Sequence, residues 1–183
     1  MALKATVCRA VVNVSDVDRH YYAEHVLTIA RHPSETDERM MVRILAFALH
    51  ADERLTFGAG LSDADEPDLW QRDLTGAITH WIEVGQPDEK RLLRACGRAA
   101  RVTAYAYRSG AELWWTPIAH ALERAEHLSV WRIPAAASQG IGKLAARTMQ
   151  LQCTVQDQQV WFGDAVTTVQ VEPVALKMGA TGI

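Results

Sequence analysis

Two acidic residues, Asp68 and Glu83, have the sequence surroundings that a divalent-metal site requires. Asp68 follows Pro67, and Glu83 lies near the end of the apolar run 77–84, which predicts a strand. If a short hairpin joins the two positions, their carboxylates converge, and converging carboxylates are what a hard divalent cation needs. A second interpretation is that Asp68 is only a turn residue and Glu83 a solvated strand end. The spacing alone leaves both interpretations open.

Glu38 is a third candidate carboxylate. It stands at the head of an apolar stripe on a predicted helix, formed by Met41, Val42, Leu45 and Leu49. Helical periodicity therefore turns Glu38 inward, where an unpaired carboxylate would cost several kcal/mol and so requires an arginine, backbone donors or a metal. The alternative is an exposed Glu38 that complements the helix dipole.

A basic stripe follows these acids in the sequence. Arg91, Arg94 and Arg98, together with Lys90 and Arg101, fall within one sector of a helix predicted to open at Gln86-Pro87-Asp88 and to end near residue 101. Arginines beside an acidic site suit phosphodiester chemistry, because they hold the backbone while a metal acts on the scissile phosphate. The competing interpretation is a solvated helix face that pairs with surface acids.

Alternating strand-like and helix-like segments must position these residues. We expect an N-terminal hairpin over 6–14 and 21–30, a helix capped by Ser34 that runs to about residue 50, a partly helical segment over 68–72, and a turn near 75–76 before the strand 77–84. Strand 102–107, helix 111–125 and strand 127–133 predict a parallel crossover. An alanine-rich helix to about 149 and an antiparallel meander over 151–155, 160–162 and 165–171 complete the chain.

Composition and length limit the class of protein. The 183 residues fit one domain over 1–183, with 49% hydrophobic and 22% charged residues and a formal net charge of −3. These values argue against disorder and against a general polyanion-binding protein, and the sequence lacks an apolar run long enough to cross a membrane. We therefore expect a cytoplasmic monomer or weak oligomer. Three widely separated cysteines, Cys8, Cys96 and Cys153, are predicted to be buried and unpaired.

Several long and unusual sequence blocks resemble the YaeQ family of bacterial proteins, and the resemblance covers essentially the whole chain. The blocks are Arg19-His20-Tyr21-Tyr22, the segment 30–40 from Ala30-Arg31-His32-Pro33 to Met40, Glu66-Pro67-Asp68-Leu69-Trp70, Gly85-Gln86-Pro87-Asp88-Glu89-Lys90-Arg91 and Met149-Gln150-Leu151-Gln152-Cys153. This resemblance implies a variant of the PD-(D/E)xK nuclease-like fold. That fold is an α/β, mixed α+β arrangement with a central mixed β-sheet flanked by helices, here with additional antiparallel strands at the N- and C-termini.

The same resemblance assigns roles to the three acids. In the nuclease superfamily a helix supplies one acid, the next strand an aspartate and the following strand another acid, and these positions correspond to Glu38, Asp68 and Glu83, which would bind Mg²⁺ or Mn²⁺. The superfamily lysine lies two positions beyond the last acid, where this chain has Gly85. Gln86 or Lys90 would then assist in its place.

The function implied by the resemblance is metal-dependent cleavage of phosphodiester bonds in nucleic acid, either DNA or RNA. Arg91, Arg94 and Arg98 would hold the phosphates. Because Gly85 replaces the lysine, the alternative is a catalytically inactive module that binds nucleic acid or protein and keeps the nuclease fold. A structural or regulatory partner protein is a third hypothesis, since a fold does not establish an activity.

Overall fold

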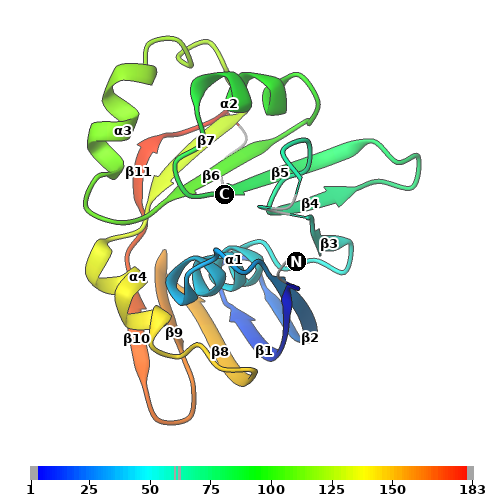
Figure 1. Cartoon of the computed structure of the whole chain (residues 1–183), viewed down its shortest axis with the longest axis vertical. Coiled ribbons are helices and arrows are strands. Elements are labelled where there is room, and N and C mark those ends of the chain that lie inside the picture. Colours follow the sequence, from blue (N-terminus) through cyan, green and yellow to red (C-terminus); the bar gives the residue numbers. More distant parts are fainter. Residues whose placement is uncertain (1–3, 60, 62, 181–183) are drawn as a thin grey trace.

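The computed structural model of the chain describes residues 4–59, 61 and 63–180, and shows a mixed α+β fold (Figure 1). The strands are β1 (Thr6–Asp16), β2 (Tyr21–Arg31), β3 (Leu55–Phe57), β4 (Leu69–Arg72), β5 (Ile78–Val84), β6 (Val102–Ala106), β7 (Leu128–Arg132), β8 (Thr148–Gln156), β9 (Gln159–Gly163), β10 (Thr168–Val171) and β11 (Val174–Lys177). The helices are α1 (Asp37–Leu49), α2 (Glu89–Cys96), α3 (Ala111–Ile118) and α4 (Ala135–Gly142).

The two ends of the chain build the first sheet, in the order β10-β9-β8-β1-β2. β1 pairs antiparallel with β2 and parallel with β8, and β8, β9 and β10 form an antiparallel meander. The predicted N-terminal hairpin and C-terminal meander are therefore confirmed. Alternate residues of β1 from Cys8 to Val14 are buried, as expected for a sheet with one face on the core.

The middle of the chain builds the second sheet, in the order β11-β7-β6-β5-β4-β3. β5, β6 and β7 are parallel, and β11 returns from the C-terminal region to pair antiparallel with β7. The predicted parallel crossover is confirmed, with α3 between β6 and β7. Every residue of β6 is buried, because layers cover both faces of the sheet at this strand.

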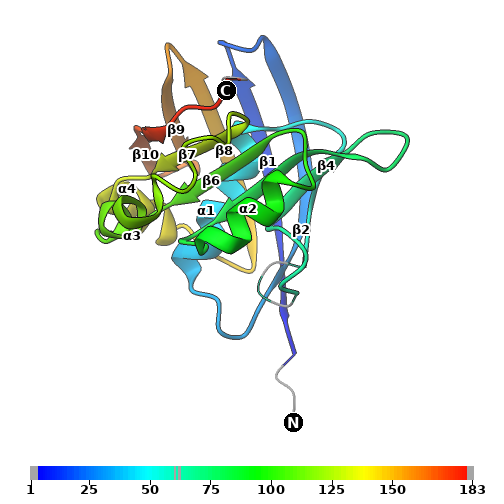
Figure 2. The same cartoon turned by 90° about the horizontal axis from the view of Figure 1, so that it is seen from above.

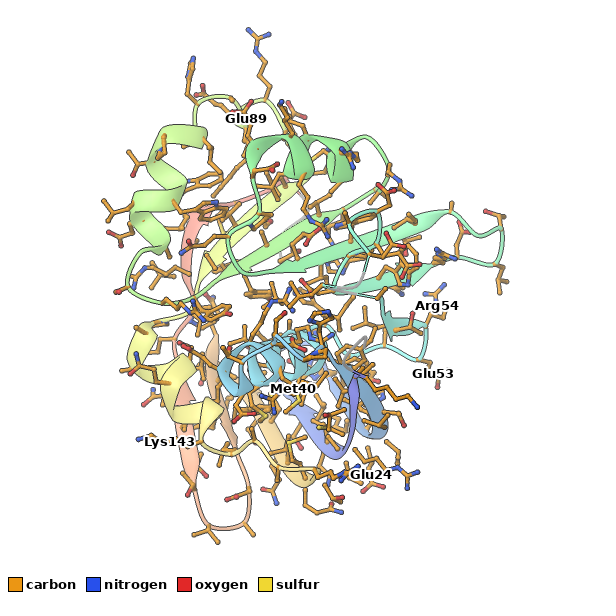
Figure 3. The ribbon with its side chains drawn as sticks, viewed as in Figure 1. Glu24, Met40, Glu53, Arg54, Glu89 and Lys143 are labelled. Atoms are coloured by element: carbon orange, nitrogen blue, oxygen red, sulfur yellow. The ribbon has the colours of Figure 1, made fainter. Side chains whose placement is uncertain are left out.

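α1 lies between the two sheets (Figure 1). Because a sheet covers it on each side, its apolar residues are spread around the helix and do not form a single stripe. Residues 40–49 are all buried, including Met40 near the middle of the molecule (Figure 3). α2 and α3 lie on the opposite face of the second sheet (Figure 2), where Trp81, Leu92 and Leu122 join one apolar cluster. α4 packs against α1.

The extra terminal strands differ in arrangement from the simplest expectation. They form a sheet of their own on the other side of α1, and β1 and β8 pair in parallel, so the added strands are not purely antiparallel. Long separation along the sequence explains why this pairing has no local signal: Arg9 of β1 is opposite Thr148 of β8. In the described part of the chain, no helix is long and apolar enough to cross a membrane.

Helix boundaries depart from the predictions for local reasons. Thr36, not Ser34, caps α1: its hydroxyl accepts a hydrogen bond from the Arg39 N–H at 3.2 Å, while the Ser34 hydroxyl lies 2.7 Å from His32 Nδ1. α2 stops at Cys96, before the predicted end near residue 101, because Gly97 follows. α3 and α4 are also shorter than predicted, ending at Ile118 and Gly142.

Two further predictions were wrong. The segment 68–72, predicted to be partly helical, contains strand β4, which pairs with β3 and β5 on its two sides. Cys8 and Cys153 are buried as predicted, but Cys96 is only partly buried.

Candidate functional site

A cleft of about 560 Å³ opens at the carboxyl ends of the parallel strands β5 and β6, beside the N-terminal end of α1. Ligands of open α/β sheets commonly bind at such strand ends. Its polar lining combines arginines, hydroxyl groups, an amide and an acid, namely Arg39, Arg91, Arg108, Ser34, Thr36, Tyr107, Gln86 and Glu83. The cleft is therefore rich in hydrogen-bond donors.

Asp68 lies next to this cleft and is only 1% exposed. Its Oδ1 accepts a hydrogen bond from Arg39 Nη2 at 2.7 Å, and its Oδ2 accepts one from the backbone N–H of Val84, also at 2.7 Å. The first contact joins Asp68 to α1, and the second joins it to the end of β5. Both carboxylate oxygens of Asp68 thus have charged or backbone donors, which is what a buried carboxylate needs.

Arg39 is the centre of a buried ion-pair network. Its Nη1 donates to Glu35 Oε1 at 2.9 Å, and its Nη2 donates to Asp68 and to the carbonyl oxygen of Val84. Arg43, one turn further along α1, donates from Nη2 to Glu35 Oε2 at 3.1 Å and to the Ala30 carbonyl oxygen. Its Nε lies 2.9 Å from Glu35 Oε1 without the alignment of a hydrogen bond. The network fixes the Arg39 guanidinium at the wall of the cleft.

Glu83 is on the other face of β5 from Ile82 and Val84 and points toward α2. Its Oε1 accepts hydrogen bonds from Trp81 Nε1 at 2.7 Å and from Arg91 Nε at 2.8 Å. Among the described residues no donor reaches Oε2. Burial, followed by the negative charge of Asp68, raises the pKa of the Glu83 carboxyl, and Trp81 and Arg91 oppose that rise.

Glu38 turns away from the other two acids. Its Oε1 accepts a hydrogen bond from the Ser138 hydroxyl of α4 at 2.7 Å, and its Oε2 lies 3.8 Å from Arg108 Nε. The backbones of α1 and α4 approach closely at this point, since a Cβ on Gly142 of α4 would lie 3.1 Å from the Glu38 Cα. With a side chain that is 20% exposed, Glu38 is neither fully buried nor fully solvated.

The three predicted metal ligands are therefore divided. Asp68 and Glu83 lie close enough for the charge of one to raise the pKa of the other, whereas Glu38 contacts α4. Within residues 4–59, 61 and 63–180, no three His, Cys, Asp or Glu side chains are arranged to hold a metal ion. The part of the predicted set that the fold brings together is the pair of Asp68 and Glu83.

Gly85 has a backbone reason to be glycine. Its φ is +115°, a conformation that side-chain-bearing residues rarely adopt, and a lysine at this position would be strained. Gln86 and Glu83 both line the cleft, and the assisting role of Gln86 stays a prediction. Lys90 is exposed in the first turn of α2 and is not among the residues that line the cleft.

The arginine stripe of α2 contacts the β3–β4 loop. Arg91 donates from Nη2 to the Glu66 carbonyl oxygen at 2.8 Å, Arg94 pairs with the Asp65 carboxylate at 3.1 Å, and Arg98 donates to the Asp65 carbonyl oxygen at 3.0 Å. The interpretation that the stripe pairs with acidic surface groups thus describes Arg94. Arg91 and Arg98 instead bind main-chain oxygens of the same loop.

Arg108 is a cleft residue that the sequence analysis did not single out. It follows β6 and has a φ of +75°, which is uncommon for a residue with a side chain and is found preferentially at functional sites. Its side chain is 56% exposed, and its guanidinium lies 5.3 Å from the centre of the Tyr107 ring. Neither the strand pattern nor the residue type reveals this backbone geometry.

Glu35, Arg39 and Arg43 were also missed, although they left a signal. They are spaced four residues apart, with Glu35 just before α1 and the two arginines on one face of it, and acid and base at this spacing commonly pair on helices. The apolar residues between them indicate a buried helix, in which such charges require partners. That combination would have identified the network.

Comparison with known proteins gives a consistent family. The family model described as YaeQ protein matches residues 1–173. An uncharacterized YaeQ protein of Salmonella typhi is 46% identical over 176 residues, which are 96% of this chain and 97% of that protein, and the one of Escherichia coli K12 is 44% identical with the same coverage.

Two solved structures share this fold. The crystal structure of YaeQ from Xanthomonas axonopodis pv. citri superposes with a TM-score of 0.91 at 46% identity, covering 94% of this chain and 98% of that one. YaeQ from Pseudomonas syringae gives a TM-score of 0.91 at 36% identity, with 95% and 97% coverage. Both the family model and the near-complete coverage show that this chain belongs to the YaeQ family.

Proposed function

We propose that the protein binds the phosphate backbone of nucleic acid in this cleft and along the arginine face of α2. The observation that carries the proposal is the convergence of Arg39, Arg91 and Arg108 on one cleft that also presents three hydroxyl groups. A guanidinium offers a fork of donors that matches phosphate oxygens, and hydroxyl groups commonly contact the backbone. These groups do not read bases, so we expect weak sequence preference.

The charges of the cleft suggest which arginine takes a phosphate first. Arg39 and Arg91 are held by Asp68 and Glu83, so their guanidinium groups are fixed but partly neutralised. Arg108 lies only at the edge of ion-pair distance from Glu38, at 3.8 Å, and is more exposed than either. We infer that Arg108 is the principal cleft contact, and that Arg94 and Arg98 extend the site along α2.

Fluorescence anisotropy with a labelled 20-nucleotide oligonucleotide, as single-stranded DNA and as RNA, tests this proposal over a range of salt concentrations. We expect binding that weakens as salt rises, and a slope of log K against log salt that falls by about 0.7 for each lost contact with a single strand. Arg108→Ala should lower the slope by the amount expected for one lost contact, and Arg94→Ala/Arg98→Ala by the amount expected for two.

Arg54→Ala is the matched control. Arg54 is an exposed arginine before β3 whose side chain hydrogen-bonds to Asp52, and Figure 3 shows it well apart from Glu89 of α2. Its removal changes the net charge by the same amount as Arg108→Ala, and should leave affinity nearly unchanged. Absent or salt-independent binding of both oligonucleotides would refute the proposal.

A second candidate function, metal-dependent cleavage of the same ligand, is favoured by the pair of Asp68 and Glu83. Mg²⁺ commonly binds through one or two carboxylates, several waters and a substrate phosphate, so two acids fit this ion better than they fit an all-protein cage. A bound Mg²⁺ or Mn²⁺ would neutralise a phosphate and activate water. Glu83, whose Oε2 has no donor among the described residues, would bind such an ion in its ionised form.

Calorimetric titration separates cleavage from binding alone. Mg²⁺ and Mn²⁺ are titrated into the wild type and into Asp68→Ala, with and without the oligonucleotide, and the oligonucleotide is then examined for cleavage. Cleavage predicts metal affinity in the wild type, enhanced by the oligonucleotide and lost in Asp68→Ala. If neither protein binds either metal under both conditions, and the oligonucleotide stays intact, this second function is excluded.

A further inference from the structure

The β3–β4 connection is longer than its geometry requires. β3 and β4 pair as an antiparallel hairpin from Phe57 opposite Leu69, and hairpin loops typically need about two to five residues. Residues 58–68 connect these two strands. The Gly58 N–H donates to the Asp68 carbonyl oxygen at 3.0 Å, so the two ends of the connection are held together at the hairpin. Closing the hairpin therefore does not account for the length of this connection.

Part of this connection lies over the arginine face of α2. We call residues 64–66 the acidic strap. Its main-chain oxygens at Ala64, Asp65 and Glu66 accept hydrogen bonds from Arg91 and Arg98, and its Asp65 carboxylate pairs with Arg94. Arg91 and Arg94 of α2, and Arg98 in the turn that follows it, thus bind oxygen atoms from one short segment of turns.

This arrangement resembles the way arginines track a phosphate backbone. Oxygen acceptors succeed one another along the strap, one of them carries a full negative charge, and each α2 arginine has at least one. Ala64 also lines the cleft beside Arg91, which continues the strap into the proposed site. The strap and a nucleic-acid backbone would therefore require the same guanidinium donors.

We propose that the acidic strap is a built-in competitor for nucleic acid: it occupies the α2 arginines in the free protein and is displaced when a phosphate backbone binds. This inference rests on the proposed function and adds its regulation. Displacement is feasible at its outer contact, because the Asp65–Arg94 pair is exposed, with Asp65 at 74% and Arg94 at 57% of their side-chain surface, and exposed ion pairs contribute little stability. Any change that lifts the strap then increases affinity.

The test compares Asp65→Ala and Asp65→Lys with the wild type in the same anisotropy titrations. Removing the carboxylate frees Arg94, and the lysine also repels the α2 arginines. We expect Asp65→Ala to bind the oligonucleotides several-fold more tightly, and Asp65→Lys more tightly still. The salt slope of Asp65→Ala should stay close to that of the wild type, because Arg94 contacts the strand in both complexes and the substitution removes only the cost of displacing the strap.

Glu53→Ala and Glu53→Lys are the charge-matched controls. Glu53 is exposed and precedes β3, at the opposite end of that strand from the β3–β4 connection, and Figure 3 shows it apart from Glu89 of α2. Its substitutions change the net charge by the same amounts as the Asp65 substitutions. If the wild type binds but the Asp65 variants gain no more than the Glu53 variants, the strap inference is overturned and the proposed function stands. If no protein in the series binds, the proposed function fails and the inference fails with it.

Discussion

Arg39 is the residue through which the carboxylates of the site are organised. It connects Glu35, just before its own helix, with Asp68, just before β4, and with the Val84 carbonyl oxygen at the end of β5. In a buried ion pair, the attraction between partners roughly offsets the cost of removing both from water, but loss of one partner leaves the other uncompensated. Asp68 is therefore more important to stability than its single charge suggests.

Asp68→Ala should destabilise the protein by about 3–5 kcal/mol, because it strands a mostly buried guanidinium and the Val84 N–H. Urea unfolding measures the loss. Asp65→Ala provides the matched comparison: this aspartate also pairs with an arginine, but at the surface, and its removal should cost less than about 1 kcal/mol. Equal losses for the two variants would show that burial does not determine the effect.

Gly85 stands where the resemblance to the nuclease superfamily would place a lysine, and its backbone conformation disfavours that side chain. We expect Gly85→Ala and Gly85→Lys each to cost about 1–2 kcal/mol, since both force a side chain into a positive-φ conformation, here +115°. Gly97→Ala is the control, with a φ of −76° and only ordinary contacts at its Cβ, and should change stability by less than about 0.5 kcal/mol. A stable Gly85→Lys variant would contradict this explanation.

At the residue scale, the sequence identified the right segments but not all of the right side chains. The helical stripe left open whether Glu38 turns inward or stays exposed, and the structure places it between the two, because α4 covers part of it and supplies Ser138. Arg39, one position further round the helix, faces Asp68 instead. The proximity of Asp68 and Glu83 could be expected from their spacing, because a short turn joins the two adjacent strands on which they lie or border, whereas their role as metal ligands stays a prediction.

A buried polar network joins the end of α1 to the second sheet. His50, directly after α1, has its Nε2 2.7 Å from the Tyr105 hydroxyl of β6, and its ring stacks edge-on against that of His80 in β5. Arg101 Nη2 lies 2.9 Å from His80 Nδ1, and a guanidinium can only donate, so Nδ1 accepts. His80 is therefore neutral and donates from Nε2 to the Thr103 hydroxyl.

This network predicts a loss of stability at mildly acidic pH. Burial, followed by the charge of Arg101, lowers the pKa of His80 from 6.5 to about 3. Below the unfolded pKa the unfolded chain binds more protons, so the stability that neutral His80 contributes is present above pH 6.5 and is lost as pH falls toward 3. One such histidine accounts for roughly 2 kcal/mol between pH 7 and 5.

Urea unfolding of His80→Gln at both pH values checks this expectation. The amide retains a hydrogen-bonding group but does not titrate, so the pH-dependent loss should shrink by roughly 2 kcal/mol relative to the wild type. Burial also lowers the pKa of His50 well below 6.5, so some loss of stability with falling pH should remain in His80→Gln. His120→Gln, at an exposed position after α3, should leave the wild-type loss unchanged. A His80→Gln profile parallel to the wild type would refute the assignment.

At the element scale, local sequence patterns predicted which helices and strands exist better than they predicted where each one begins and ends. The hairpin β1–β2 and the crossover through α3 followed from alternation and from strand–helix–strand order. β4 was mistaken for a partly helical segment because four residues are too few for alternation to show, and its pairing with β3 and β5 decides its structure. The parallel pairing of β1 with β8 is wholly tertiary and leaves no local trace.

For the whole molecule, α1 acts as the shared core of two sheets. It contacts β1 and β8 of the first sheet and β5 of the second, and a single apolar cluster runs from Val12 and Ile29 through Leu45 to Ile82. If α1 unfolds, each sheet exposes to water the apolar face that packs against this helix. The two sheets should therefore unfold together, although most of their strands come from separate parts of the chain.

Leu45→Ala tests this coupling, because Leu45 is 1% exposed within α1. We expect a loss of about 2–5 kcal/mol from the lost contacts and the cavity. Tryptophan fluorescence, which reports mainly on the second sheet through Trp70, Trp81 and Trp131, and far-ultraviolet circular dichroism, which reports on all elements, should shift to the same lower urea midpoint. Leu113→Ala, the same change at an 82% exposed position on α3, should stay within about 0.5 kcal/mol of the wild type. Separate midpoints for the two probes in Leu45→Ala would mean that each sheet holds together without the helix, and that the second sheet is stable independently of the first.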